Sequence, residues 1–195
     1  MLRAELEHAI RAATEIVAAD HVIVIGSQAI LGSYTEDQLP DEATASIEVD
    51  IAPMHDDDAG ALATRIDAFL GEWSEFHEAH GFYVQGVGRD AAVLPAGWED
   101  RLVAVSGPGT NGRTGLCLDP HDLCVAKLAA GREKDHRFVG ALLRAGLVDL
   151  GVIADRTRLL PPAHVRTRKA IESWIAAVAR ARGTEPPRLG HGIEI

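Results

Sequence analysis

Features that would place a protein in a specialised class are scarce in this sequence. The 195-residue chain has only two cysteines, Cys117 and Cys124. Their spacing is neither a CxxC pair nor half of a zinc pattern, so we expect both to be small buried side chains in a reducing compartment. Nine histidines occur without HxxxH or HExxH spacing, which argues against a zinc site.

Long apolar runs are also lacking. No stretch approaches the roughly 18 apolar residues of a membrane-spanning helix. Residues 1–7 form an acidic amphipathic pattern and lack the apolar run of a signal peptide. The composition is that of a globular protein, with 47% hydrophobic and 25% charged residues. We therefore expect a soluble, cytoplasmic protein that does not bind membranes.

The net charge of −10 is distributed unevenly. Residues 1–112 contain 5 Lys/Arg and 20 Asp/Glu, whereas residues 113–195 contain 14 and 9. An acidic first half and a basic second half fit a metal site that faces a surface for a polyanion. Acidic loops and a basic helical surface that only confer solubility explain the same distribution equally well.

The first half of the sequence mixes helix and strand patterns. Apolar residues at helical spacing predict a helix over 2–19. The β-branched run 21–25 predicts a buried strand that enters a tight turn at Gly26-Ser27. Residues 46–52 alternate polar and apolar side chains, as a strand with one polar face does. The remaining elements are a short helix at 28–31, a loop at 35–45, and strands at 82–87, 101–105 and 114–118.

Helices are predicted elsewhere in the chain. Asp56-Asp57-Asp58 suit the first turn of a helix whose Ile66, Phe69 and Leu70 lie along one side. Asp119-Pro120-His121-Asp122 is a strong helix start, and Gly131 should end that helix. Three further helices are expected from about 133, over 147–157 and over 164–182. The expected fold class is α/β (α+β): a mixed sheet flanked by helices over 1–118, then a helical subdomain over 119–195.

The strand 46–52 carries the first candidate site. Glu48 and Asp50 are two residues apart, so both carboxylates point to the same face of the sheet. Hard oxygen ligands at this separation suit Mg²⁺ that is shared with a nucleoside triphosphate. The Gly26-Ser27 turn offers backbone N–H groups and a hydroxyl to phosphate oxygens. Together they meet the needs of phosphoryl-type transfer.

This order of features resembles the polymerase-β-like nucleotidyltransferase superfamily, in which a Gly-Ser turn precedes a strand with an Asp/Glu-x-Asp/Glu pattern. The resemblance is nearest to the AbiEii-like and MenT-like toxins of toxin–antitoxin systems. The matching segments are Ser46-Ile47-Glu48-Val49-Asp50 and the later Lys127 and Asp135, within residues 20–52 and 114–150. Glu48 stands where the family usually has Asp, and the interval from Ser27 to Glu48 is longer than usual. Residues 35–45 would then form an inserted loop over the site.

The resemblance implies a role for each of these residues. Glu48 and Asp50 would hold Mg²⁺, while Lys127 and the cradle of Gly26, Ser27 and Ser46 would bind the phosphates of the NTP. Asp135 would orient the acceptor or complete the metal site. The third carboxylate of the superfamily is not assigned, and Asp100 or Asp135 could supply it. A basic cluster of Arg132, Lys134 and Arg137 would either be solvated or contact nucleic-acid phosphates.

The expected function is transfer of NMP from an NTP to an acceptor hydroxyl, with release of pyrophosphate. By resemblance the acceptor is an RNA 3′ end such as that of tRNA, and a cognate antitoxin protein would be a partner. Two alternatives stay open: the same chemistry on a small molecule or a protein, and an inactive module that only binds nucleotide. A ribonuclease of the Arg-x4–6-His type is disfavoured, because its matches arise easily by chance.

Overall fold

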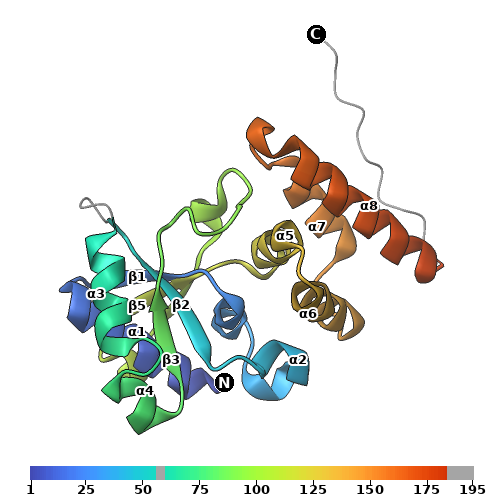
Figure 1. Ribbon diagram of the computed structural model, residues 1–195. Coiled ribbons are helices and arrows are strands. Elements are labelled where there is room, and N and C mark those ends of the chain that lie inside the picture. Colours follow the sequence, from blue (N-terminus) through green and yellow to red (C-terminus); the bar gives the residue numbers. More distant parts are fainter. Residues whose placement is uncertain (56–59, 184–195) are drawn as a thin grey trace.

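The computed structural model describes residues 1–55 and 60–183, and its centre is a five-stranded mixed sheet (Figure 1). This confirms the predicted fold class of a small mixed sheet combined with helices, and all five predicted strands are present. The strands follow the spatial order β3-β2-β1-β5-β4. They are β1 (His21–Val24), β2 (Glu48–Pro53), β3 (Tyr83–Gly86), β4 (Val103–Ser106) and β5 (Thr114–Cys117).

The central strand β1 organises the sheet. It pairs antiparallel with β2 and parallel with β5, while β3 runs parallel to β2 and β4 antiparallel to β5. Val22, Ile23 and Val24 are each completely buried. A strand whose successive side chains are all buried must be covered on both faces, as its continuous apolar run predicts.

One face of the sheet is covered by α1 (Arg3–Val17), α3 (Ala61–Leu70) and α4 (Glu75–His80). Helix packing there is close. A Cβ at Gly115 of β5 would lie 2.3 Å from Ile10 Cδ1 of α1, and one at Gly86 of β3 would lie 1.8 Å from the Ala63 carbonyl oxygen of α3. These glycines let both helices lie directly on the strands.

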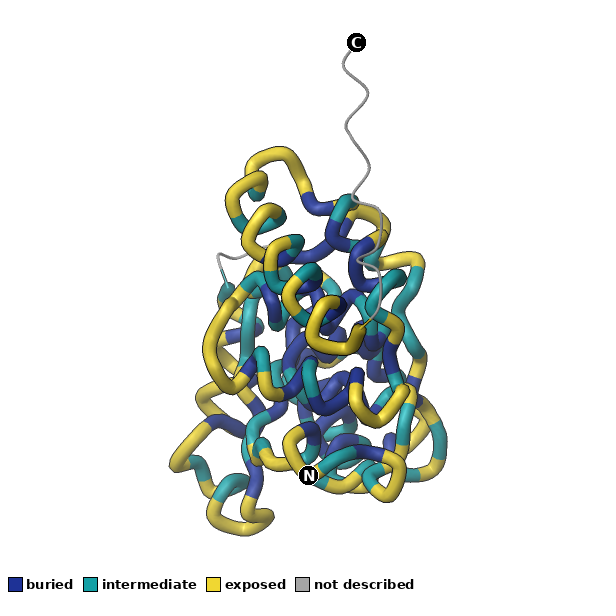
Figure 2. The backbone as a smooth tube through the Cα atoms, turned by 90° about the vertical axis from the view of Figure 1, so that its right-hand side faces the viewer, coloured by how far each residue is buried: buried dark blue, intermediate teal, exposed yellow. Residues whose placement is uncertain are grey.

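The other side of the fold is formed by the short 3-10 helix η1 (Ser27–Gly32) and by four helices late in the chain. Burial is continuous between the sheet and these helices (Figure 2), and one hydrophobic core contains residues of both. The four helices are α5 (Pro120–Ala130), α6 (Glu133–Arg144), α7 (Leu150–Arg158) and α8 (Val165–Ala181).

Helix α5 begins and ends where the sequence predicts. The Asp119 side chain accepts hydrogen bonds from the N–H groups of His121 and Asp122, and Pro120 occupies the first helical position. Gly131 ends the helix in the left-handed conformation at φ 67°. These signals act within one turn of the chain, which is why the sequence alone is enough to place them.

Residues 35–45 are more ordered than the predicted loop. They contain the 3-10 helix η2 (Glu36–Gln38) and the single-turn helix α2 (Asp41–Thr44). The N–H of Thr35 donates to Gln38 Oε1 over 3.0 Å, which closes η2, and the α-ammonium group of Met1 donates to the Thr44 carbonyl at the end of α2. The second contact joins residues far apart in sequence, so a local pattern does not reveal it.

Three further expectations differ from the structure or fall outside it. Phe69 is 60% exposed, whereas Ala63, Ile66 and Leu70 form the buried stripe of α3; at 100° per residue Phe69 lies to the side of that stripe. Strand β4 starts only at Val103, because Trp98–Arg101 form the 3-10 helix η3. The predicted helix start at Asp56-Asp57-Asp58 lies outside the described residues.

Both cysteines are completely buried. Burial raises the pKa of the Cys117 thiol to about 12, and it raises the pKa of the Cys124 thiol as well. They therefore pack as small apolar side chains, as predicted. In the described part of the chain, no helix combines the length and the apolar character needed to cross a bilayer.

A buried carboxylate connects the two sides of the fold. Asp122 of α5 has a fully buried side chain, 2.7 Å from Nε of Arg101 in η3 and 3.3 Å from Nε of Arg156 in α7. The two arginine side chains are 19% and 27% exposed. Asp122 thus balances two guanidinium groups that come from different elements.

Replacing this carboxylate should destabilise the protein. In Asp122→Ala, Arg101 and Arg156 would face each other without a buried counter-charge, so we expect a loss of about 3 kcal/mol or more in the free energy of unfolding. Urea denaturation followed by circular dichroism would measure it. The matched control is Asp155→Ala, which removes the partner of Arg158 from a largely exposed pair and should cost at most about 1 kcal/mol. Equal losses in the two variants would contradict the role given to Asp122.

Candidate active site

The strand register places Glu48 and Asp50 on the face of the sheet opposite to α1 and α3. Ile51 pairs with Gly86, which lies under α3, so the alternate residues of β2 point to the other side. Val49 and Ile51 are buried, whereas Glu48 and Asp50 are only half-buried. The two acidic side chains therefore share one partly open face.

Asp50 lies against the turn that follows β1. A Cβ on Gly26 would lie only 1.6 Å from Asp50 Oδ2 and 2.5 Å from its Cγ. The φ of Gly26 is −75°, a value that any residue can adopt, so the glycine is required by this close approach and not by its backbone conformation. The carboxylate and the turn thus form one unit.

The turn itself carries backbone hydrogen-bond donors. Its first helical hydrogen bond runs from the N–H of Ala29 to the Gly26 carbonyl over 3.0 Å. Among the described residues, no bond is found from the N–H groups of Ser27 or Gln28, as is usual at the start of a helix. Ser27 lines the cavity in front of Asp50.

Ser46 supports the start of β2. Its hydroxyl accepts a 3.2 Å hydrogen bond from the N–H of Glu48, and its carbonyl accepts a 3.3 Å bond from the buried side chain of Gln28. Gln28 connects the Gly26-Ser27 turn to the acidic strand through this bond. Ser46 therefore has a structural role as well as a place in the cavity wall.

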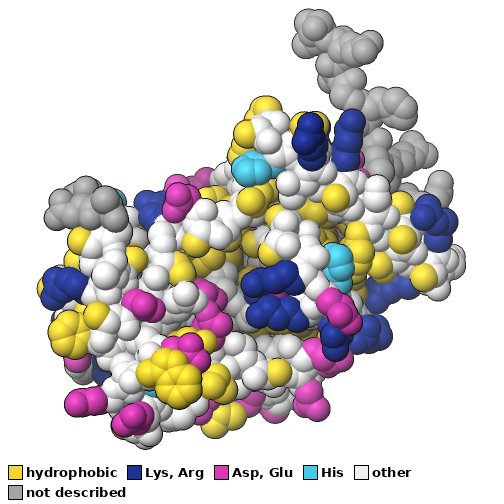
Figure 3. Space-filling model, viewed as in Figure 1, with side chains coloured by type: hydrophobic (Ala, Val, Ile, Leu, Met, Phe, Trp, Pro, Cys, Tyr) yellow, Lys and Arg dark blue, Asp and Glu magenta, His cyan; other side chains and the backbone are white. Residues whose placement is uncertain are grey.

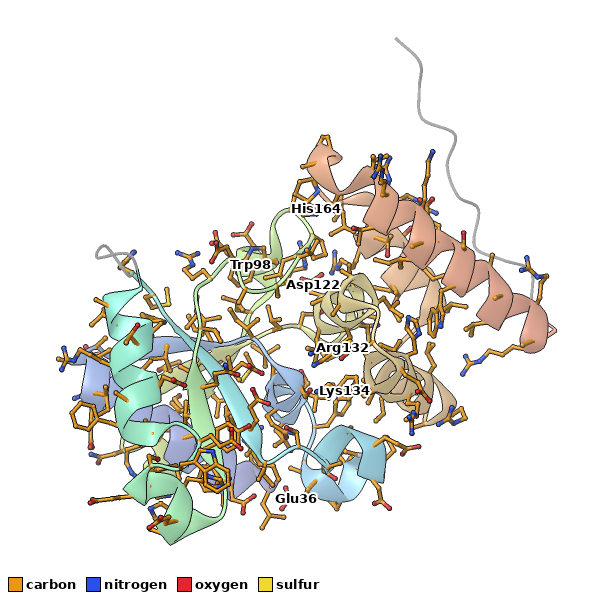
Figure 4. All side chains as sticks on the ribbon, in the orientation of Figure 1. Glu36, Trp98, Asp122, Arg132, Lys134 and His164 are labelled. Carbon is orange, nitrogen blue, oxygen red and sulfur yellow. The ribbon has the colours of Figure 1, made fainter. Side chains whose placement is uncertain are left out.

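Lys127 reaches the site from α5. Its side chain is 12% exposed, its Nζ lies 3.6 Å from Asp135 Oδ1, and it lies 5.7 Å from the centre of the Phe138 ring. Arg132 holds the same carboxylate with bonds of 2.6 and 3.3 Å. Asp135 thus fixes two cations, Lys127 and Arg132, that face the acidic strand. Figure 4 shows Arg132 beside α5 and a further cation, Lys134, beside α6, both on the side of the sheet.

These side chains surround one cavity of about 540 Å³ between β2, α2, α5 and α6. A smaller and more apolar hollow of about 200 Å³ adjoins it, and Asp50, Lys127 and Arg132 border both. Of the predicted site residues, Gly26 lines the smaller hollow. The larger cavity is lined by Ser27, Ser46, Glu48, Asp50, Lys127 and Asp135, together with Glu42, Ala43 and Ala45 of the segment 35–45.

Burial, together with the neighbouring charges, determines the direction of the pKa shift of these groups. Burial, and next the negative charge of Glu48, raise the pKa of Asp50 despite the attraction of Lys127. Burial lowers the pKa of Lys127, against the attraction of Asp135 and Asp50. Burial also opposes ionisation of Asp135, but the hydrogen bonds from Arg132 and the charge of Lys127 outweigh it and lower the pKa of Asp135. Of the two carboxylates, Asp50 is therefore the one whose ionised form is disfavoured by its surroundings.

Tyr83 is a site residue that the sequence did not reveal. It pairs with Glu48 across β2 and β3, and this pairing brings its hydroxyl close to the Glu48 carboxylate. Burial and the charge of Glu48 raise the pKa of Tyr83, which keeps the hydroxyl protonated as a donor. The same pairing brings Gln85 beside Asp50, where it lines the cavity. The longer arm of Glu48 is thus held in place from the neighbouring strand.

The remaining candidates are divided between the site and other surfaces. Lys134 lines the main cavity with Arg132, whereas Arg137 pairs with the exposed Glu133 and lines a different hollow. Asp100 is exposed in η3 and lines none of the hollows described here. Of the two proposed third carboxylates, only Asp135 lies near the acidic pair, and it is occupied by Lys127 and Arg132.

The acidic pair fits a hard divalent cation. Burial and, after it, the repulsion between these two carboxylates raise the pKa of Asp50, and a bound cation would offset both effects. In the part of the chain that the structure describes, no three His, Cys, Asp or Glu side chains form a metal cluster. Glu48 and Asp50 would therefore supply two ligands, which leaves other positions to water and phosphate oxygens, as is common for Mg²⁺.

The stress on Asp50 predicts a pH-dependent gain in stability on its removal. Because its native pKa is raised above 3.8, the native protein loses this proton at a higher pH than the unfolded chain does. The contribution of Asp50 to the free energy of unfolding therefore falls as the pH rises from 3.8 to the raised native pKa, and it stays lower above that pKa. Without added metal, Asp50→Asn should have a higher Tm than the parent at about pH 7.5, and the gain should vanish well below pH 3.8. A lower Tm of Asp50→Asn at neutral pH would contradict the strained carboxylate.

Comparison with known proteins fits this arrangement. Searches of curated proteins and of solved structures found no match. One family model matches residues 4–160, and its description is "Nucleotidyltransferase of unknown function (DUF6036)". The match includes β1, the Gly26-Ser27 turn, the acidic strand β2, and helices α5 and α6 with Lys127 and Asp135. The chain is therefore a member of this nucleotidyltransferase family.

Proposed function

We propose that this protein transfers a nucleoside monophosphate from an NTP to the 3′-hydroxyl of an RNA, with tRNA as the expected acceptor. It would act in the cytoplasm as a toxin that a cognate antitoxin protein restrains. The observation that carries the proposal is the contact of the Asp50 carboxylate with Gly26, at the smaller hollow that Lys127 also lines. A metal-binding acid and a phosphate-binding turn must be this close to act on one triphosphate.

In the proposed reaction, the acceptor oxygen forms a bond to the α-phosphorus, and the bond from that phosphorus to the pyrophosphate breaks. Pyrophosphate and the hydroxyl proton are released. Mg²⁺ bound at Glu48 and Asp50 would neutralise the negative charge of the reacting phosphates. Because little covalent chemistry is left to the protein, its task is to position the reactants and stabilise charge.

The chain's own groups have distinct tasks in this proposal. Ser27, with the N–H groups at the start of η1, would bind phosphate oxygens, and Lys127 would balance the charge of the departing pyrophosphate. Asp135 and Phe138 hold Lys127 at the cavity wall, so less side-chain entropy is lost when the triphosphate binds. Tyr83 would keep the Glu48 carboxylate directed at the cation.

An RNA acceptor is favoured by the distribution of charge. On the face in Figure 3, Asp and Glu lie mainly over the sheet, whereas Lys and Arg gather over α6 and α8. The cavity wall on that side carries Lys127, Arg132 and Lys134. A polyanion is attracted to such a surface, while a small neutral acceptor gains little from it.

Removing one metal-binding charge should abolish transfer in a folded protein. We expect Asp50→Asn to lower kcat/KM for nucleotide incorporation about a thousandfold or more, because several kcal/mol of charge stabilisation are lost. The assay is mass analysis of total RNA after incubation with each NTP and Mg²⁺, where transfer adds the mass of an NMP.

The control is Asp67→Asn, which changes an exposed aspartate on α3 far from the cavity and should retain full activity. Chelation of the metal should stop the reaction of the parent. Full incorporation by Asp50→Asn would overturn the mechanism, and an unchanged RNA mass with all four NTPs would overturn the RNA acceptor.

A further inference from the structure

A groove outside the candidate active site runs between α6 and α8. It consists of two surface hollows of about 440 and 480 Å³. The first is bordered by α5, by Arg166 and by Trp174, and the second by Arg137, Arg182 and Trp174. We refer to the two together as the α6–α8 groove. No step of the proposed transfer reaction uses it.

An aromatic pair divides the groove. The rings of His136 on α6 and Trp174 on α8 are stacked, with centres 5.7 Å apart and planes 23° from parallel. Both residues line both hollows, so a flat group that enters either hollow meets a ring. Flat aromatic walls of this kind bind unpaired nucleobases without regard to sequence.

The rim of the groove is cationic. Helix α8 carries four Lys/Arg and one Glu, and the second hollow adds Arg137 and Arg144 from α6. Arg137 is paired with Glu133 and Arg144 with Glu42. Arg166 and Arg182 are exposed, and the ion pairs found among the described residues do not involve them. These two arginines keep their charge available for a phosphate group.

The groove begins next to the catalytic cavity. Arg132 and Asp135 line that cavity, and His136 lines both hollows of the groove. Arg132 and His136 are four residues apart, which is about 6 Å along the axis of a helix, so the groove starts about one helical turn from the cavity. A strand whose end lies in the cavity would continue naturally along α6 toward α8.

We propose that the α6–α8 groove binds the single-stranded segment of an RNA acceptor just before its 3′ end, with a base against Trp174 and phosphates on Arg166 and Arg182. This inference rests on the proposed transfer to RNA. It adds where the acceptor strand lies and why the acceptor is a polymer and not a small molecule. Stacking on aromatic rings between cationic residues is the usual basis of single-strand binding.

Equilibrium binding of a fluorescein-labelled single-stranded RNA, followed by anisotropy, tests the groove directly. Arg166→Glu should raise the Kd about tenfold or more at low salt and reduce the dependence of binding on salt. Trp174→Ala should raise the Kd about fivefold to a hundredfold, the loss of one stacked base. Arg65→Glu is the matched control: it reverses an exposed helical arginine on α3 and should leave the Kd within about twofold.

A second measurement separates folding from binding. Trp174 also packs against the core, so the Tm of each variant is measured, and Trp174→Phe, which keeps an aromatic ring, should recover most of the RNA affinity. The affinity for an NTP with Mg²⁺ should be the same in all variants, because the groove lies outside the nucleotide cavity.

The outcomes distinguish the two proposals. If Arg166→Glu weakens RNA binding but no NTP is incorporated into RNA, the groove stands and the transfer reaction fails. If RNA is extended but Arg166→Glu and Trp174→Ala leave both the Kd and the KM for RNA unchanged, the groove proposal fails and the transfer stands. Equal weakening by Arg65→Glu and Arg166→Glu would also overturn it, since only net charge would then matter.

Discussion

The site depends on the contact between the Asp50 carboxylate and Gly26. This contact joins the end of β1 to the middle of β2, two strands that are adjacent and antiparallel. It leaves no room for a side chain at position 26 and brings an acidic group to the turn, where no hydrogen bond from the N–H groups of Ser27 and Gln28 is found within the described residues. A partly buried negative charge is costly without a cation nearby. The same geometry therefore accounts for the position of Lys127 and for the fit of the acidic pair to a divalent ion.

The cations come from a part of the fold that is far from β2 in sequence. Lys127 lies in the last turn of α5, and Asp122 anchors the start of the same helix through Arg101 and Arg156. Asp135, in the first turn of α6, fixes Lys127 from the other side. The position of the lysine is thus set at two points by buried carboxylates. The cavity has acidic side chains on the β2 side and basic side chains on the α5 and α6 side. Each set of charges lowers the cost of burying the other.

Much of the fold could be predicted from the sequence because its signals are local. The apolar run of β1, the alternation of β2 and the Asp119-Pro120 start of α5 each act within a few residues. The acidic pair and the turn are found the same way. Their closeness follows from β1 and β2 being neighbours in the sheet, which the order of strands in the sequence makes natural.

The rest could not be predicted, because it depends on pairings between distant segments. Tyr83 reaches Glu48 only through the parallel register of β2 and β3, which no local pattern specifies. Ordering of residues 35–45 relies on contacts such as that of Met1 with Thr44. The sequence suggests that Asp135 orients the acceptor or completes the metal site, but its contacts with Lys127 and Arg132 become visible only once α5 and α6 are placed side by side. Stacking of His136 on Trp174 likewise requires α6 and α8 to be adjacent.

The most direct test of this account is a crystal structure with Mn²⁺ and a non-hydrolysable NTP. Manganese replaces Mg²⁺ in oxygen sites and can be located by its anomalous scattering. The account predicts a manganese peak between the carboxylates of Glu48 and Asp50, with the triphosphate between Ser27 and Lys127. A peak away from both carboxylates, or a triphosphate bound outside this cavity, would contradict it.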